Sequence, residues 1–236
     1  MLDVAEGAGM TEPDASDFAE MALALHEEPD VEQTLERVVG YARQATVCDD
    51  AGLILQHGQG RLETAVASDP RVRKADELQT ELAEGPCFQA IQGQISTLVD
   101  DTATDPRWPE WGPRAAELGL RSVLSVRLHT AHTTLGALNL YGGRPGMFDD
   151  DDVDVAEIFG RHASIALASA REEDGLRQAI GARHLIGLAQ GILMERYGLD
   201  ADRAFAVLRR YSRHTNTKLR SVAERVIATG RLPDEP

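Results

Sequence analysis

The sequence predicts two parts: an α+β domain in which helices flank an antiparallel sheet, followed by an all-α domain of three helices. The first observation is a change of periodicity. Between residues 51 and 142, strand-like apolar stretches alternate with turns and helical segments, whereas beyond residue 149 apolar residues recur only at helical spacing. The second observation is charge. Residues 176–232 hold eleven Lys or Arg against four Asp or Glu, a net of +7, while the whole chain carries −15.

The N-terminal elements are predicted to be two helices and a β-hairpin. Apolar residues at helical spacing predict helices over 15–25 and 31–46, and Asp30 is placed to cap the second by accepting backbone N–H groups of its first turn. From residue 51 the pattern predicts strands over 51–55 and 62–68. The sequence His-Gly-Gln-Gly (57–60), which lies between these strands, is typical of a hairpin connection.

The middle of the chain alternates helices and strands. The predicted elements are a helix over 71–83, a turn at Gly85 and Pro86, a short strand over 95–99 and a helix over 106–118. The two most regular strands, 122–128 and 134–142, are separated by a short polar connection and are therefore predicted to form a second hairpin.

Residues 149–170 show helical periodicity, and the four aspartates 149–152 suit the positive end of a helix dipole. One stripe of this helix is apolar and consists of Val153, Ala156, Phe159, Ala163, Ala166, Leu167 and Ala170. The small residues in the stripe permit close approach of another helix, so residues 153–170 fit a dimer interface. They fit equally well the packing of the helix on the protein's own sheet, and the sequence leaves both interpretations open.

Three amphipathic helices are predicted in the basic segment, and together they make a small bundle. Gly198 is placed to end the first, Asp200 to cap the second, and Thr215 or Asn216 to cap the third. Their apolar faces are, in order, Leu185, Leu188, Ala189, Ile192 and Leu193; Ala204, Phe205, Leu208 and Tyr211; and Leu219, Val222, Ala223, Val226 and Ile227.

The overall composition predicts a cytoplasmic protein with no membrane partner. Cys48 and Cys87 are too few for a disulfide framework, which indicates a reducing compartment. The first ten residues lack the cationic and apolar regions of a signal peptide, and no apolar run approaches the roughly 18–20 residues that span a bilayer.

The basic segment is the first candidate functional region, because a cationic module on an otherwise acidic chain indicates a polyanion partner. It contains IGLAQGILMERYGL (186–199), Ala204-Phe205, LRRYS (208–212), Thr215-Asn216 and KLRSVAE (218–224). In order and spacing these blocks resemble the ANTAR domain, the RNA-binding antitermination module of bacterial regulators. The resemblance implies that the segment binds RNA hairpins in nascent transcripts. The sequence departs from the family at Gln190, where the family often has lysine.

The expected RNA surface lies at the junction of the second and third helices of this segment, where basic and hydrogen-bonding side chains concentrate. The candidate RNA-binding residues are Arg183, Gln190, Arg209, Arg210, Ser212, Arg213, Thr215, Asn216, Lys218 and Arg220. Asn216 has two open interpretations, a helix cap or a base contact. Tyr211 likewise fits core packing or stacking on a base.

Four further blocks, EGPCFQAI (84–91), DPRWPEW (105–111), LGLRSVLSVRL (118–128) and LGALNLYGGRPGMFDDDD (135–152), resemble a GAF domain, most closely those fused to ANTAR modules in actinobacterial proteins. The resemblance implies a sensor domain that often encloses a small ligand and commonly forms a homodimer; the ligand itself is not indicated. The predicted organisation is therefore a GAF-like sensor domain over 18–170, a helical linker over 171–182 and an ANTAR domain over 183–232.

No active site, cofactor site or metal site is indicated, so a regulator is expected rather than an enzyme. Cys87 follows Gly85-Pro86 and could lie at a helix start, where a thiolate is stabilised, but a structural cysteine is the simpler interpretation. The seven histidines show no metal-ligand spacing. Two alternatives remain: a transcription factor that binds duplex DNA through its basic helices, and a GAF-type redox enzyme that uses Cys87.

Overall fold

The computed structural model describes residues 23–24, 30–93 and 95–232. The chain divides into two compact units, Met1–Arg171 and Glu172–Pro236, and each is described by itself. The helix predicted over 15–25 lies outside the described residues apart from residues 23 and 24, which are helical.

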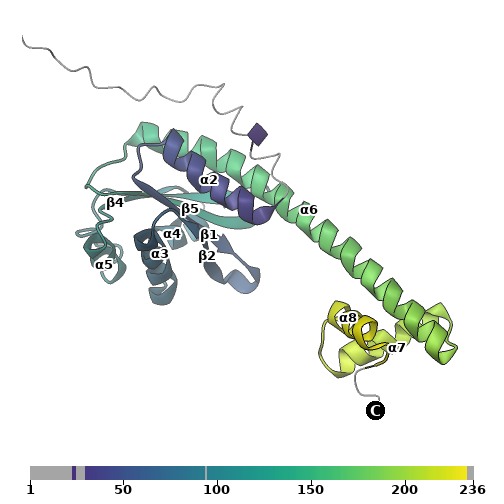
Figure 1. Ribbon diagram of the computed structural model, residues 1–236. Coiled ribbons are helices and arrows are strands. Elements are labelled where there is room, and N and C mark those ends of the chain that lie inside the picture. The colour runs from purple at the N-terminus through teal and green to yellow at the C-terminus, as the bar shows by residue number, and fades with distance from the viewer. Residues whose placement is uncertain (1–22, 25–29, 94, 233–236) are drawn as a thin grey trace, which may run out of the picture. The chain divides into compact units, whose positions relative to one another are not determined.

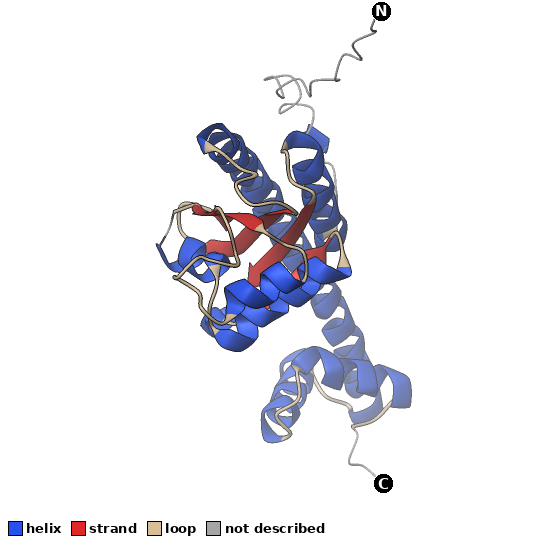
Figure 2. Ribbon diagram, turned by 90° about the vertical axis from the view of Figure 1, so that its left-hand side faces the viewer, coloured by secondary structure: helices blue, strands red, loops and turns tan. Residues whose placement is uncertain are grey.

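The first unit is built on a five-stranded antiparallel sheet with the order β2-β1-β5-β4-β3. The strands, drawn in red in Figure 2, are β1 (Asp50–Gln56), β2 (Leu62–Ala67), β3 (Thr97–Val99), β4 (Ser122–His129) and β5 (Thr134–Gly142). All five predicted strands are confirmed, and the neighbours β1–β2 and β4–β5 are the two predicted hairpins. The central pair β1–β5 joins segments that are far apart in sequence, so no local pattern predicted it.

Helix α2 (Val31–Ala45) and the first part of α6 (Asp150–Tyr197) cover one face of the sheet (Figure 1). The cap predicted for α2 is confirmed, because Asp30 Oδ1 accepts the Glu32 N–H at 3.1 Å. Ala156, Phe159 and Ala163 are fully buried in the core between these helices and the sheet. The interpretation of the 153–170 stripe as a dimer interface is therefore wrong: the stripe packs on the protein's own sheet.

Helices α3 (Pro70–Leu82), α4 (Pro86–Gly93) and α5 (Trp111–Glu117) cover the other face, as Figure 1 shows. Trp111 is fully buried there, and its Nε1 donates to the Ala75 carbonyl at 3.0 Å. Trp108 meets it edge to face with a centroid distance of 6.2 Å. Both tryptophans therefore belong to the core.

Two helix boundaries differ from the sequence-based expectation. The helix expected over 106–118 begins only at Trp111, because Pro109 disfavours helical backbone at Trp108 and the Glu84 carboxylate accepts the N–H groups of Glu110 and Trp111, both at 3.1 Å. Helix α4 was expected only as a turn, because its eight residues are too short for a clear periodicity.

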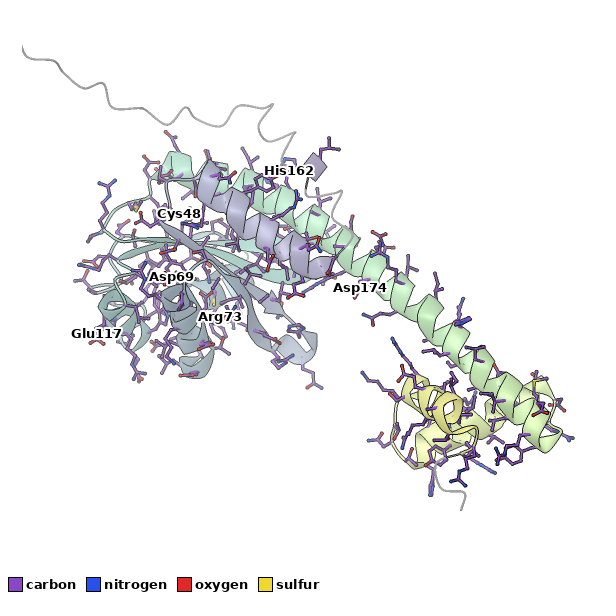
Figure 3. All side chains as sticks on the ribbon, in the orientation of Figure 1. Cys48, Asp69, Arg73, Glu117, His162 and Asp174 are labelled. Atoms are coloured by element: carbon purple, nitrogen blue, oxygen red, sulfur yellow. The ribbon has the colours of Figure 1, made fainter. Side chains whose placement is uncertain are left out.

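Helix α3 has the N-terminal features expected of a well-formed helix. Asp69 Oδ1 accepts the Arg71 N–H at 2.7 Å, and Pro70 occupies the first helical position, where its missing N–H costs no hydrogen bond. Figure 3 labels Asp69 at this end of the helix and Arg73 one turn further along.

Helix α6 begins with a reciprocal cap, because Asp149 Oδ1 accepts the Asp152 N–H at 3.0 Å while Asp152 Oδ2 accepts the Asp149 N–H at 2.9 Å. It then continues without a break to Tyr197. The first helix predicted in the basic segment is therefore the last part of α6 and not a separate element. Among the described residues, no helix is both long and apolar enough to cross a bilayer.

The second unit is completed by α7 (Ala201–His214) and α8 (Leu219–Thr229). Its core is formed by buried residues of all three helices: Ala189, Leu193, Ala204, Leu208, Val222, Ala223 and Val226. The fold class is thus an α+β domain with a flanked antiparallel sheet followed by an all-α three-helix unit, as predicted.

Candidate nucleic-acid interface

The start of α7 is held as the sequence predicts. Asp200 Oδ1 accepts the Arg203 N–H at 2.7 Å, which caps the helix. The Gln190 side chain of α6 donates from Nε2 to the Ala201 carbonyl at 3.1 Å. Gln190 therefore ties α6 to the first turn of α7, a role that the sequence did not indicate.

The α7–α8 junction is a compact turn, and here the expected caps are wrong. The residue that precedes α8 is Lys218, and neither Thr215 nor Asn216 caps this helix. Asn216 instead has a left-handed backbone with φ +49. Its N–H donates to the Arg213 carbonyl, and the Thr217 N–H donates to the Ser212 carbonyl at 3.0 Å. These are the two hydrogen bonds of a Schellman motif, so Asn216 terminates α7.

Two hydroxyl groups of the predicted RNA surface are used within this turn. Ser212 Oγ donates to the Thr217 carbonyl at 2.7 Å, and Thr215 Oγ1 donates to the Tyr211 carbonyl at 2.9 Å. Their protons are therefore committed to the fold, although their oxygens retain lone pairs. Ser212 and Thr215 primarily shape the junction.

The basic residues behave differently. Arg183, Arg209, Arg210, Arg213 and Lys218 are all exposed, and across residues 30–93 and 95–232 none of them forms a salt bridge within 4.0 Å. Arg220 is exposed but pairs with Glu224 at 3.0 Å. Arg209, Arg210 and Arg213 lie on α7, and Lys218 lies in the turn that follows it. Arg183 lies apart from them on α6.

A shallow depression on α7 was not anticipated as a site. Its volume is about 290 Å³, and it is lined by Val207, Arg210, Tyr211, His214 and Leu232. The first four residues follow the spacing i, i+3, i+4, i+7, which places them on one face of α7. That spacing is visible in the sequence, but the contribution of Leu232, from the segment after α8, depends on how the chain folds back.

The first unit holds a buried polar cluster centred on Asp76 of α3. Asp76 Oδ1 accepts the Tyr141 hydroxyl at 2.6 Å and the Asn139 amide at 2.9 Å. Among the described residues Oδ2 has no hydrogen-bond partner, and it lies against the backbone of Gly52, where an added Cβ would be 2.5 Å away. Complete burial raises the pKa of Asp76 from 3.8 to about 7, more than the hydrogen bonds from Tyr141 and Asn139 lower it.

Cys87 lies next to this cluster, in the first turn of α4. Its side chain is fully buried, and its backbone N–H donates to Gln79 Oε1 at 2.9 Å. Burial, followed by the nearby Asp76, raises the pKa of the thiol well above 9.0, and burial raises that of Cys48 to about 11. Both cysteines are therefore neutral thiols at pH 7, which works against the nucleophilic role considered for Cys87.

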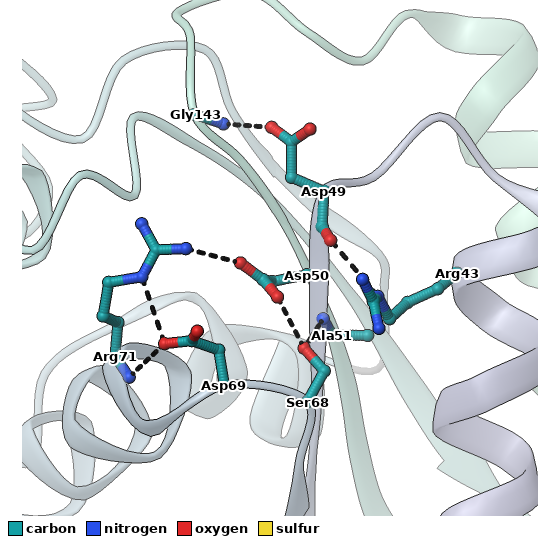
Figure 4. Close-up of polar contacts among 8 residues, drawn as sticks. All are labelled: Arg43, Asp49, Asp50, Ala51, Ser68, Asp69, Arg71 and Gly143. Carbon is teal, nitrogen blue, oxygen red and sulfur yellow. Dashed lines mark hydrogen bonds and ion pairs between the residues drawn. The ribbon is translucent and has the colours of Figure 1, made fainter.

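A second polar network closes one end of the sheet (Figure 4). Asp50 accepts Ser68 Oγ at 2.8 Å and Arg71 Nη2 at 3.0 Å, which joins β1 to the start of α3. Asp49 Oδ2 accepts the Gly143 N–H at 2.7 Å, and the Asp49 carbonyl accepts Arg43 Nε at 3.2 Å. Since each carboxylate already holds donors from its neighbours, this network stabilises the fold.

An antiparallel sheet with α2 and α6 on one face and α3, α4 and α5 on the other is the architecture of GAF sensor domains. The chain belongs to the GAF domain family, whose model matches residues 28–168. The ANTAR domain model matches residues 174–227, so the two domains follow one another in the predicted order. This combination of a GAF sensor domain and an ANTAR domain supports a sensor-controlled regulator.

Solved structures agree with this assignment of the fold. A GAF domain of a phosphoenolpyruvate-protein phosphotransferase from Coxiella burnetii has 16% identity and a TM-score of 0.54, with 67% of this chain and 94% of that chain covered. A putative GAF sensor protein from Burkholderia vietnamiensis has 19% identity and a TM-score of 0.52, with coverages of 70% and 99%. A free methionine-R-sulfoxide reductase from Neisseria meningitidis has 16% identity and a TM-score of 0.53, with coverages of 66% and 88%. No curated protein matches the sequence.

Proposed function

We propose that this protein is a signal-responsive transcription antitermination regulator that binds RNA hairpins through its C-terminal unit, under the control of the GAF domain. The proposed parts are a sensor domain over 18–170 with an unidentified small-molecule ligand, a linker over 171–182 and an RNA-binding domain over 183–232. Action on nascent transcripts implies a cytoplasmic protein, and the resemblance of its sequence blocks supports the actinobacterial GAF–ANTAR type.

One observation carries this proposal: among residues 30–93 and 95–232, four exposed cations of α7 and of the turn before α8 form no salt bridge, in a protein that is otherwise strongly acidic. Arg209, Arg210, Arg213 and Lys218 can each neutralise a phosphate without first breaking an ion pair. The rest of the chain nets about −22 and repels a polyanion, which directs nucleic acid to this unit. Hairpin RNA fits such a surface because its loop exposes phosphates and unstacked bases together.

The proposal predicts salt-dependent binding to hairpin RNA. Each neutralised phosphate makes the slope of log affinity against log salt concentration more negative by about 0.7. With four or five phosphates neutralised, the affinity of the full chain should fall roughly 30-fold between 0.1 M and 0.3 M salt. Fluorescence anisotropy with a labelled hairpin measures this slope. A duplex DNA of the same length is the control for the DNA-binding alternative, and tighter binding to the duplex than to the hairpin would favour that alternative.

The redox-enzyme alternative requires a reactive thiolate, and the buried, neutral Cys87 does not provide one. The likeness to a methionine-R-sulfoxide reductase, at 16% identity, extends to the fold only. A regulator without an active site at Cys87 is therefore the function that we favour.

We also propose that the protein is a homodimer, through the outer face of α6 and not through the buried stripe. In the first unit Ile158 and Ile165 are 41% and 63% exposed, and they lie seven residues apart. In the second unit Leu176 and Ile180 are 59% and 67% exposed, and they lie four residues apart. Both spacings place apolar side chains on one side of a helix, the pattern through which two helices pair.

The dimer has a direct test. Ile165→Glu should convert the full chain to a monomer at micromolar concentration in sedimentation velocity, because it introduces a charge into an apolar helix pair. Ile95→Glu is the matched control, since Ile95 is 58% exposed but lies outside α6, and it should leave the dimer intact. A monomeric wild-type protein, or a dimeric Ile165→Glu variant, would contradict the proposal.

A further inference from the structure

The depression lined by Val207, Arg210, Tyr211, His214 and Leu232 is separate from the turn at Asn216 and has a different chemistry. Its floor and walls are mainly apolar, whereas the turn presents hydroxyl and amide groups. Its volume of about 290 Å³ is near the lower limit of about 300 Å³ for small-ligand sites, so it accepts one small planar group rather than an extended ligand.

Three of the five lining side chains are planar: the phenol of Tyr211, the imidazole of His214 and the guanidinium of Arg210. Aromatic rings and guanidinium planes are the groups on which proteins stack unpaired bases. Arg210 and His214 are exposed at the rim, and Arg210 carries a positive charge that complements the phosphate attached to such a base. Val207 and Leu232 supply apolar surface that the face of a base would cover.

We propose that this depression is a base-binding pocket that takes one unstacked nucleobase from the loop of a hairpin RNA. The inference rests on the RNA-binding function proposed above. It adds a site that contributes to RNA affinity through contacts with a base and not with phosphates. The charge of the unit favours this occupant: with eleven basic and four acidic residues over 176–232, a ligand that carries phosphates next to a planar group is complementary to it.

The test compares two hairpin RNAs bound by the full chain. One has a loop of mixed sequence, and the other has the same stem and the same loop length with abasic loop nucleotides, so that the phosphates remain and the bases are absent. The wild-type protein should bind the intact loop about tenfold more tightly, which corresponds to the lower part of the range of about 1–3 kcal/mol per stacked base.

Tyr211→Leu should reduce this preference while leaving binding to the abasic hairpin unchanged, and Tyr211→Phe should retain it because the ring is kept. Tyr211 also packs against the core of the unit, so thermal denaturation accompanies each measurement. His214→Ala is a second variant at an exposed rim position and should reduce the preference without affecting the fold. Arg209→Ala, on the opposite side of α7, should instead weaken binding to both RNAs alike.

The outcomes separate the pocket from the function on which it rests. A wild-type protein that binds neither hairpin contradicts both proposals. Binding of both hairpins with equal affinity, or a tenfold preference that survives in folded Tyr211→Leu and in His214→Ala, overturns the pocket and leaves RNA binding through phosphates in place.

Discussion

Raising the pH from 5 to 8 is expected to destabilise this protein by roughly 2–3 kcal/mol through Asp76 alone, since each pKa unit between the folded and unfolded states corresponds to about 1.36 kcal/mol. Burial raises the folded-state pKa of Asp76 from 3.8 to about 7, so the folded protein holds this proton more tightly than the unfolded chain. The stabilisation is complete below pH 4 and is lost as the pH rises through about 7.

The geometry explains why the charged form is costly. Tyr141 and Asn139 both donate to Oδ1, while Oδ2 faces the backbone of Gly52 and has no donor among the described residues. A carboxylate would leave half of its charge unsolvated in the core, whereas the protonated acid does not. Asp76→Asn has nearly the shape of the protonated acid but does not titrate, so the stability of this variant should lack the pH dependence that Asp76 causes.

Urea denaturation at several pH values measures the effect as the difference in unfolding free energy between the wild-type protein and Asp76→Asn. Asp69→Asn is the control, because the backbone and side chain of Arg71 lower the pKa of this exposed carboxyl and it remains ionised throughout the range. Parallel profiles for the wild-type protein and Asp76→Asn between pH 5 and 8 would show that Asp76 is not the responsible group.

The second large effect is expected at Asn216, where we propose that the side-chain amide reads a base of the RNA loop. Both Asn216→Gly and Asn216→Ala remove the amide, so each should reduce the discrimination between a matched loop and a substituted loop by about 1–3 kcal/mol. Only the alanine variant should also lose stability, by roughly 1 kcal/mol, because alanine is strained in the left-handed conformation with φ +49 that glycine adopts freely.

The two substitutions separate recognition from the Schellman turn. Binding of both hairpins by anisotropy, together with thermal denaturation, gives discrimination and stability for each variant. If Asn216→Gly discriminates loops as well as the wild-type protein does, Asn216 serves only to end α7. Arg213→Ala provides the comparison for a phosphate contact and should weaken binding to every hairpin by the same factor.

Much of the fold follows from local patterns. In the hairpin strands β4 and β5, apolar residues alternate with polar ones or follow one another over seven or more residues. The caps at Asp30 and Asp200 are short-range hydrogen bonds that need no distant partner. The basic residues of α7 are exposed for the same local reason, because its apolar face is already occupied by Ala204 and Leu208. The order of the two domains also follows from the sequence blocks that resemble GAF and ANTAR domains.

Other features depend on contacts between distant segments. The apolar stripe of α6 specifies that one face is buried, but only the packing of Phe159 against the sheet shows that the protein's own core covers it. Asn216 and Thr215 have the composition of an N-cap, yet the hydrogen bonds of the turn make them the end of the preceding helix. Helix α5 is shortened by Glu84, a residue 26 positions before Glu110.

Periodicity and turn chemistry act over a few residues, so the helices, the strands and the cationic surface can be predicted directly from the sequence. The pKa of Asp76, the burial of Cys87 and the pocket completed by Leu232 arise only when segments far apart in sequence are brought together and water is excluded between them. Desolvation and shape are properties of the assembled core, and so the chemistry of these groups was decided by the tertiary structure.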